Sequence, residues 1–275
     1  MKYSLVDLVK SQLRCSSGSP CDANGYVDDP TDNLLPGVKR DQFEPDLKNG
    51  GGHELETKFR AVHSSSALAI NTFAPFKDAP GSLTILGRQR FRSLVFEKHL
   101  PTGLKGTPPN LDVYLQSDDE VVAIESKFLE YFTPKVAKFS NSYSRERLPL
   151  AEDRWWRVLE ESKTAGPRHL DVAQLVKHYL GLIRLMNHDG RDGWKPKVAT
   201  LLYLFWEPTN GHEIEECQTH RRGIEQLASK VNGSRIRFGS LSYPELWESW
   251  GSVPEIAAHV KNLKARYSLT VKLPC

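Results

Sequence analysis

The stretch that most constrains the fold is residues 107–127, which reads as two β-strands joined by a tight polar turn. In the first strand, Leu111, Val113 and Leu115 alternate with more polar residues, which is the period of a half-buried strand. Residues 117–120 form the turn, and residues 121–127 form the second strand. A hairpin closed symmetrically around Asp118-Asp119 sets Asp112 directly opposite Glu125.

This register predicts a site that favours a cation. Directly opposed residues of a hairpin have Cβ atoms about 4.5–5.5 Å apart. Two carboxylates that close repel each other, and one of them normally shifts its pKa. A divalent cation between Asp112 and Glu125 removes the repulsion. Lys127 shares a face with Glu125, because strand side chains repeat every two residues.

The order Asp112, short hairpin, Glu125-Ser126-Lys127 resembles the PD-(D/E)XK nuclease superfamily. The proline of that pattern lies a few residues early here, at Pro108-Pro109. In the superfamily the Asp and Glu bind a magnesium-type ion and the Lys assists the attacking water. The resemblance implies Mg²⁺ as cofactor, with Mn²⁺ as a substitute, and Asp112, Glu125 and the Ser126 carbonyl as ligands. An exposed hairpin with scattered charges is the alternative interpretation.

The resemblance also implies an α/β fold, with a restriction-endonuclease-like core, a central mixed β-sheet and flanking helices. A helix that precedes the catalytic sheet often supplies a further acid in this superfamily. We expect a helix over residues 54–73, so Glu54 is the candidate for a catalytic and metal-binding role. The alternative is that Glu54 is a favourable charge at a helix N-terminus.

A second candidate lies on the strongest predicted helix, residues 171–186, which carries a continuous apolar stripe. Nucleases of the RecB and lambda-exonuclease type carry Gln-x-x-x-Tyr on this helix. Here Gln174 is followed at the fourth position by His178, and Tyr179 comes one residue later. Gln174 is therefore a candidate for positioning the water or Lys127. The alternative is a capping arrangement with Asp171.

The rest of the sequence predicts further strands and helices around this hairpin, including a crossover between parallel strands and additional C-terminal elements. Residues 94–96 predict a strand, and Arg88, Arg90 and Arg92 before it would share one face if extended. Residues 197–206 are a continuous apolar run, typical of a strand buried on both faces. A helix, a strand and two helices are predicted at 214–231, 235–241, 243–250 and 254–267. We predict an irregular N-terminal extension, 1–53, and one nuclease-like domain, 54–275, with an insertion at about 129–170.

Composition narrows the class of protein. No run approaches the roughly 20 apolar residues of a membrane helix, so no membrane association is expected. The four cysteines form no CxxC pair, and the first ten residues do not resemble a secretory signal, which favours the cytoplasm. The net charge of +3 and the mix of basic and aromatic residues in 129–170 suit nucleic acid.

Together these features predict a metal-dependent nuclease that hydrolyses phosphodiester bonds in DNA. The alternative is a catalytically silent nucleic-acid-binding domain on the same fold. RNA as substrate and a homodimeric state are left open by the sequence.

Overall fold

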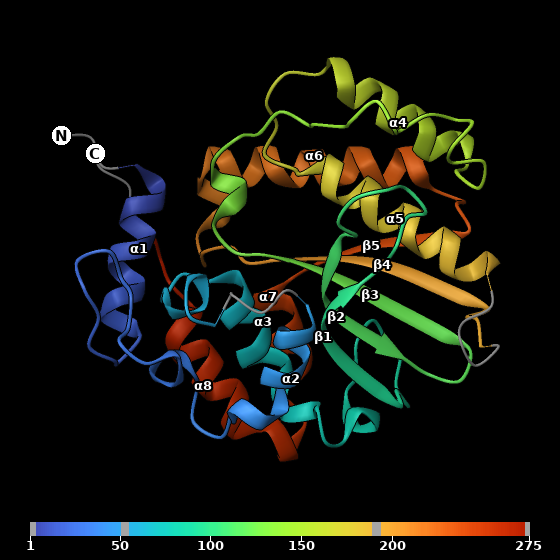
Figure 1. Ribbon diagram of the computed structural model, residues 1–275. Helices are drawn as coiled ribbons and strands as arrows, with labels where there is room; N and C mark the ends of the chain where they lie inside the picture. The colour runs from blue at the N-terminus through green and yellow to red at the C-terminus, as the bar shows by residue number, and fades with distance from the viewer. Residues whose placement is uncertain (1–3, 51–54, 189–193, 273–275) are drawn as a thin grey trace.

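A central five-stranded sheet organises the computed structural model, which describes residues 4–50, 55–188 and 194–272 (Figure 1). The strands are β1 (Ser93–His99), β2 (Asn110–Gln116), β3 (Glu120–Lys127), β4 (Val198–Phe205) and β5 (Ile236–Ser242), and they lie side by side in that order. Strands β1, β2 and β3 pair antiparallel, whereas β3, β4 and β5 pair parallel. The sheet is therefore mixed, and the predicted α/β fold class is confirmed.

The hairpin β2–β3 has the predicted register. Val113 pairs with Ile124, Leu115 with Val122 and Gln116 with Val121. The recorded ladder ends at Val113 and Ile124, one position before Asp112 and Glu125. The two strands thus carry their acidic residues to the point where β2 and β3 stop pairing with each other, whereas β1–β2 and β3–β4 continue to pair.

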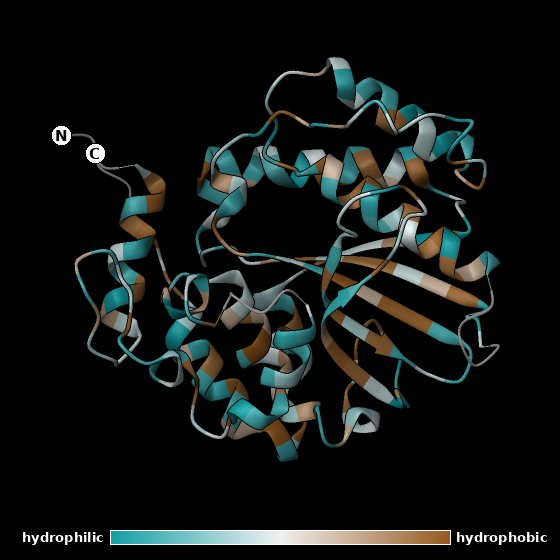
Figure 2. Cartoon of the chain, viewed as in Figure 1, coloured by the Kyte–Doolittle hydropathy of each residue, from teal (hydrophilic) through white to brown (hydrophobic). Residues whose placement is uncertain are grey.

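Alternate residues of the central strands pack into two separate cores. Val122, Ile124 and Leu202 face a core shared with α1 (Leu5–Ser16), α3 (Ser65–Phe73), α7 (Tyr243–Ser249) and α8 (Ala257–Tyr267). Ala123 and Leu201 face a second core shared with α4 (Asp153–Thr164), α5 (Val172–Asn187) and α6 (Glu215–Val231). The strands are mainly apolar, as Figure 2 shows by colour, because helices cover both faces of the sheet.

The crossover from β3 to β4 runs through α4 and α5, as the apolar patterns predicted. Asp171 caps α5 at its N-terminus by accepting a hydrogen bond from the backbone N–H of Gln174 at 3.1 Å. Gly181 lets α5 lie close to the chain that leaves β1, since an added Cβ would stand 2.6 Å from Cγ of Leu100. This close approach fixes the position of α5 relative to the sheet.

The helix expected over residues 54–73 is shorter than predicted. Helix α3 begins only at Ser65, and Ser64 caps it by accepting from the backbone N–H of Ala67 at 3.2 Å. Backbone groups just before it are paired elsewhere: Val27 N donates to Arg60 O, and Val62 N donates to Gly25 O. An α-helix cannot use the same groups, so the chain enters α3 from the 3-10 turn Lys58–Arg60 and the bridge between Tyr26 and Ala61. Glu54 lies outside the described residues.

The N-terminal stretch predicted as irregular also contains regular structure. A short helix, α2 (Glu44–Asn49), follows Phe43, which is fully buried and packs in the same core as α3. In the described part of the chain, no helix combines the length and the apolar character that crossing a bilayer requires.

The arginines at 88, 90 and 92 do not share one extended face. Arg88 lies in a tight bridge with Ile85, and Arg90 has a positive φ of 63°. Arg88 is ion-paired with Glu120, and Arg92 with Asp118. Arg88 and Arg92 therefore lie at the β2–β3 turn, at the opposite end of the hairpin from Asp112 and Glu125, and the single extended face is not formed.

Candidate active site

The candidate site forms where β2 and β3 diverge. Asp112 stands near the start of β2, and its Oδ2 accepts a hydrogen bond of 2.6 Å from the backbone N–H of Ser126. Glu125 and Lys127 stand near the end of β3. The sheet therefore brings three of the predicted site residues together through strand geometry alone.

Glu125 is the most buried charged group of the site, at 1% exposure. One oxygen, Oε1, is ion-paired with Nζ of Lys127. The other, Oε2, lies 2.6 Å from Nε2 of His178, which projects from α5 and is fully buried. A buried carboxylate requires such partners, because it has lost its hydration.

The charges of the site depend strongly on one another. Burial raises the pKa of Asp112 well above its usual value, and the neighbouring carboxylates of Glu125 and Glu97 raise it further. Burial also acts to raise the pKa of Glu125, but Lys127 and His178 outweigh it and lower that pKa to about 2. For Lys127, burial is outweighed by Glu125 and Asp112, so its pKa is raised.

Among the described residues, these directions describe one ammonium beside three carboxylates. Lys127 is ion-paired with Glu125, and burial beside Glu125 and Glu97 favours the protonated form of Asp112, so the ionised site is short of positive charge. A divalent cation would supply that missing positive charge. Mg²⁺ is commonly held by one or two protein carboxylates and keeps several of its waters. Asp112 and Glu125 therefore fit a magnesium-type ion.

Few protein groups are available to hold a metal ion at this site. Within residues 4–50, 55–188 and 194–272, no group of three or more His, Cys, Asp or Glu side chains is arranged to hold a metal. The Ser126 side chain faces away from the carboxylates, since its Oγ lies 2.7 Å from the buried Tyr243 hydroxyl on α7. Only the backbone of Ser126 is available to the site.

Gln174 reaches the site through His178. Its amide nitrogen lies 3.1 Å from the same imidazole nitrogen, Nε2, that contacts Glu125. Gln174 and His178 are one turn apart on α5, so the helix presents both to the end of β3. The structure thus places Gln174 beside the candidate site, behind His178 and without a recorded contact to Lys127.

Two residues at the site lie outside the predicted catalytic and metal-binding set. His178, which the sequence places at the helical position of the Tyr in Gln-x-x-x-Tyr and four residues from Gln174, contacts Glu125. Glu97 lies on β1 between the pairs Phe96–Val113 and Lys98–Leu111, beside Asp112. Its positive φ of 48° and its bond from Asn110, 3.2 Å, have no sequence signature.

The mixed sheet, the flanking helices and the Asp112–Glu125–Lys127 arrangement define a restriction-endonuclease-like fold. A family described as "restriction endonuclease associating with ARP" matches residues 9–268. The chain belongs to this family. No curated protein and no solved structure matches the chain.

Proposed function

We propose that this protein is a metal-dependent nuclease that hydrolyses phosphodiester bonds in DNA. The observation that carries the proposal is the buried Glu125, held between Lys127 and His178 beside a second carboxyl group, that of Asp112. Membership in a restriction endonuclease family supports the same reaction and favours cleavage within a DNA chain.

Asp112, Glu125 and the Ser126 backbone carbonyl would hold the metal, with Mg²⁺ as the ion and Mn²⁺ as its substitute. When bound, the ion would polarise the scissile phosphate and promote ionisation of the attacking water. Glu54 stays a candidate for an additional ligand.

The protein's own groups would orient the reactants. Lys127 is held at the end of β3 by Glu125, and an ammonium there can donate hydrogen bonds to an attacking water or to a phosphate oxygen. His178 fixes one oxygen of Glu125, which leaves the other for Lys127 or a cation. Gln174 lies beside His178 on the same helix and stays a candidate for positioning the attacking water or Lys127. DNA is the proposed partner, and the cytoplasm is the proposed location.

Cleavage of supercoiled plasmid DNA tests this proposal. With Mg²⁺ the protein should convert the plasmid to open or linear forms, and with EDTA it should not. Asp112→Asn and Lys127→Ala should each lower the rate by at least about 10²–10³-fold, the usual cost of losing one group that stabilises charge in the transition state.

The chain offers matched controls at the other end of the same hairpin. Asp118 and Lys197 are exposed, with side-chain exposures of 62% and 80%, so Asp118→Asn and Lys197→Ala should leave the rate unchanged. Salt-sensitive DNA binding without cleavage would instead favour a catalytically silent binding domain. Undiminished cleavage by Asp112→Asn and Lys127→Ala would remove the assignment of the site.

A further inference from the structure

A hollow of about 420 Å³ lies beside the candidate site, between the 101–109 loop and the N-terminal half of α5. We call it the loop hollow. Lys105, Lys138 and Lys177 line it, together with Gln174 and Tyr143, and no acidic residue lines it in the described part of the chain. The described lining is therefore positively charged.

A second hollow of about 410 Å³ lies between α1, the N-terminal end of α3 and the segment that follows β3. We call it the helix hollow. Lys10, Lys58 and Lys135 line it. Among the residues that the structure describes, Glu130 is the one acidic residue that lines it, and its Oε2 accepts a hydrogen bond of 2.7 Å from the backbone N–H of Phe128.

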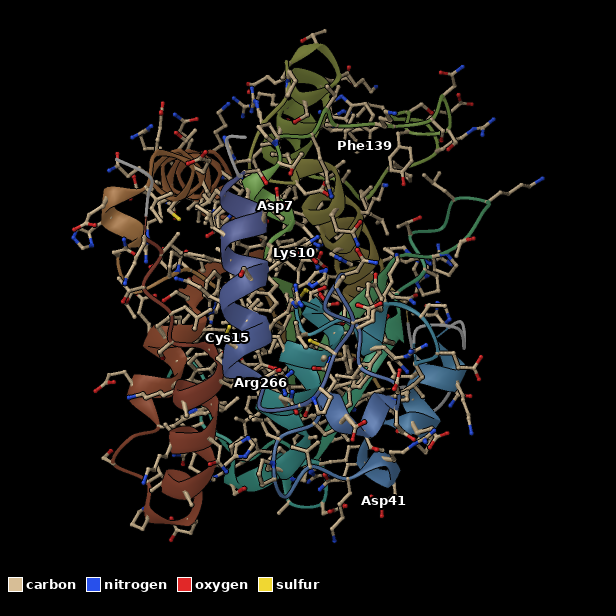
Figure 3. The ribbon with its side chains drawn as sticks, turned by 90° about the vertical axis from the view of Figure 1, so that its left-hand side faces the viewer. Asp7, Lys10, Cys15, Asp41, Phe139 and Arg266 are labelled. Carbon is tan, nitrogen blue, oxygen red and sulfur yellow. The ribbon has the colours of Figure 1, made fainter. Side chains whose placement is uncertain are left out.

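The two hollows approach the candidate site from different sides. Gln174, which lines the loop hollow, contacts His178 and through it Glu125. Glu130 and Lys135, which line the helix hollow, also line a small cleft with Lys127. A smaller hollow of about 160 Å³, lined by Lys135, Lys138 and Lys177 among others, shares lining residues with both. Figure 3 presents this side of the molecule, with Lys10 on α1 and Phe139 above it on the segment between β3 and α4.

The six lysines of the hollows have no ion-pair partner among the described residues. Lysines elsewhere on the surface commonly have one: Lys48 pairs with Glu44, Lys77 with Asp46 and Lys264 with Glu248. Ammonium groups that outnumber the acidic groups around them repel one another, and a bound polyanion relieves this repulsion. Because these lysines lie beside the proposed nuclease site, the polyanion they would bind is the phosphate backbone of its DNA substrate.

We propose that the loop hollow and the helix hollow bind backbone phosphates of one DNA strand on the two sides of the scissile phosphodiester. The inference rests on the proposed nuclease function and adds the path of the substrate. The strand crosses from one hollow to the other over Lys127. Contacts of this kind position the substrate and do not depend on its base sequence.

Salt-dependent binding of a short fluorescent DNA duplex to the full-length protein in EDTA tests this path. Each lysine–phosphate contact contributes a slope of about −0.9 to a plot of log Kobs against log salt concentration. Lys138→Gln with Lys177→Gln should make the slope less steep by about 2, and so should Lys10→Gln with Lys58→Gln. A matched control is Lys39→Gln with Lys261→Gln, because both lysines are exposed, form no recorded ion pair and lie outside the hollows.

The proposal predicts weaker binding and a shallower slope for both hollow variants and an unchanged slope for the control. An unchanged slope in either hollow variant would overturn the two-sided path, and equal changes in all three variants would show a diffuse charge effect and overturn it as well. A different result would overturn the proposed nuclease function itself: unmodified protein that neither binds nor cleaves DNA.

Discussion

Replacing His178 with Phe tests how Glu125 is held. His178 is fully buried, and its Nε2 lies 2.6 Å from Oε2 of Glu125. Phe has a ring of similar size but cannot donate, so the change removes the hydrogen bond and creates little empty space. Leaving a buried, charged acceptor without this partner costs about 2–3 kcal/mol. For a chain of this size the melting temperature should fall by about 4–8 °C.

Thermal denaturation with and without Mn²⁺ is the assay. The loss caused by His178→Phe should be smaller in saturating Mn²⁺, because a cation at Glu125 gives the carboxylate a new partner. His178→Gln serves as the control, since its amide N–H can still donate to Glu125, and it should lose less than half as much. Equal falls in melting temperature for His178→Phe and His178→Gln, or no effect of Mn²⁺ on either, would show that a hydrogen bond from His178 does not hold Glu125.

Three further changes have definite expected outcomes. Gly181→Ala places a Cβ 2.6 Å from Cγ of Leu100 and 2.8 Å from its carbonyl oxygen, so overpacking of about 1–3 kcal/mol should exceed the helix-propensity gain of about 1 kcal/mol in a chemical denaturation series. Tyr243→Phe leaves Oγ of Ser126 buried without its 2.7 Å partner and should lower the free energy of unfolding by about 1–3 kcal/mol in the same series, whereas an unchanged value would contradict this. Because the pKa of Asp112 is raised on folding, its contribution to metal-free stability is present below its unfolded pKa and is lost as the pH rises through the folded pKa. Mn²⁺ should therefore raise the melting temperature more at higher pH within that window, and a pH-independent increase would count against a role for Asp112.

The sequence predicted the hairpin well because two independent signals coincide there. The alternation in β2 places Val113 and Leu115 in one core as expected, although Leu111 lies in the other core with Tyr114. The short polar turn fixes the register, so Val113 pairs with Ile124. The continuous apolar sequence of β4 reflects contributions to the cores on both faces of the sheet, and the apolar stripe of α5 packs into one of these cores. Periodicity carries this information because it reflects local geometry.

The sequence could not show long-range pairing. The start of α3 depends on backbone bonds between residues 25–27 and 60–62, which no local propensity encodes. The contact of His178 with Glu125 joins residues 53 positions apart. The arginines before β1 looked extended, but a positive φ at Arg90 and ion pairs to the hairpin turn place them elsewhere. Each of these features is set by tertiary packing.

Crystals soaked in Mn²⁺ test directly whether Asp112 and Glu125 hold a divalent metal. We expect an anomalous scattering peak between the two carboxylates, with Lys127 displaced from Glu125, and no peak in crystals of Asp112→Asn. Crystals that diffract well but show no peak there, or a peak that persists in Asp112→Asn, would contradict the proposed metal site.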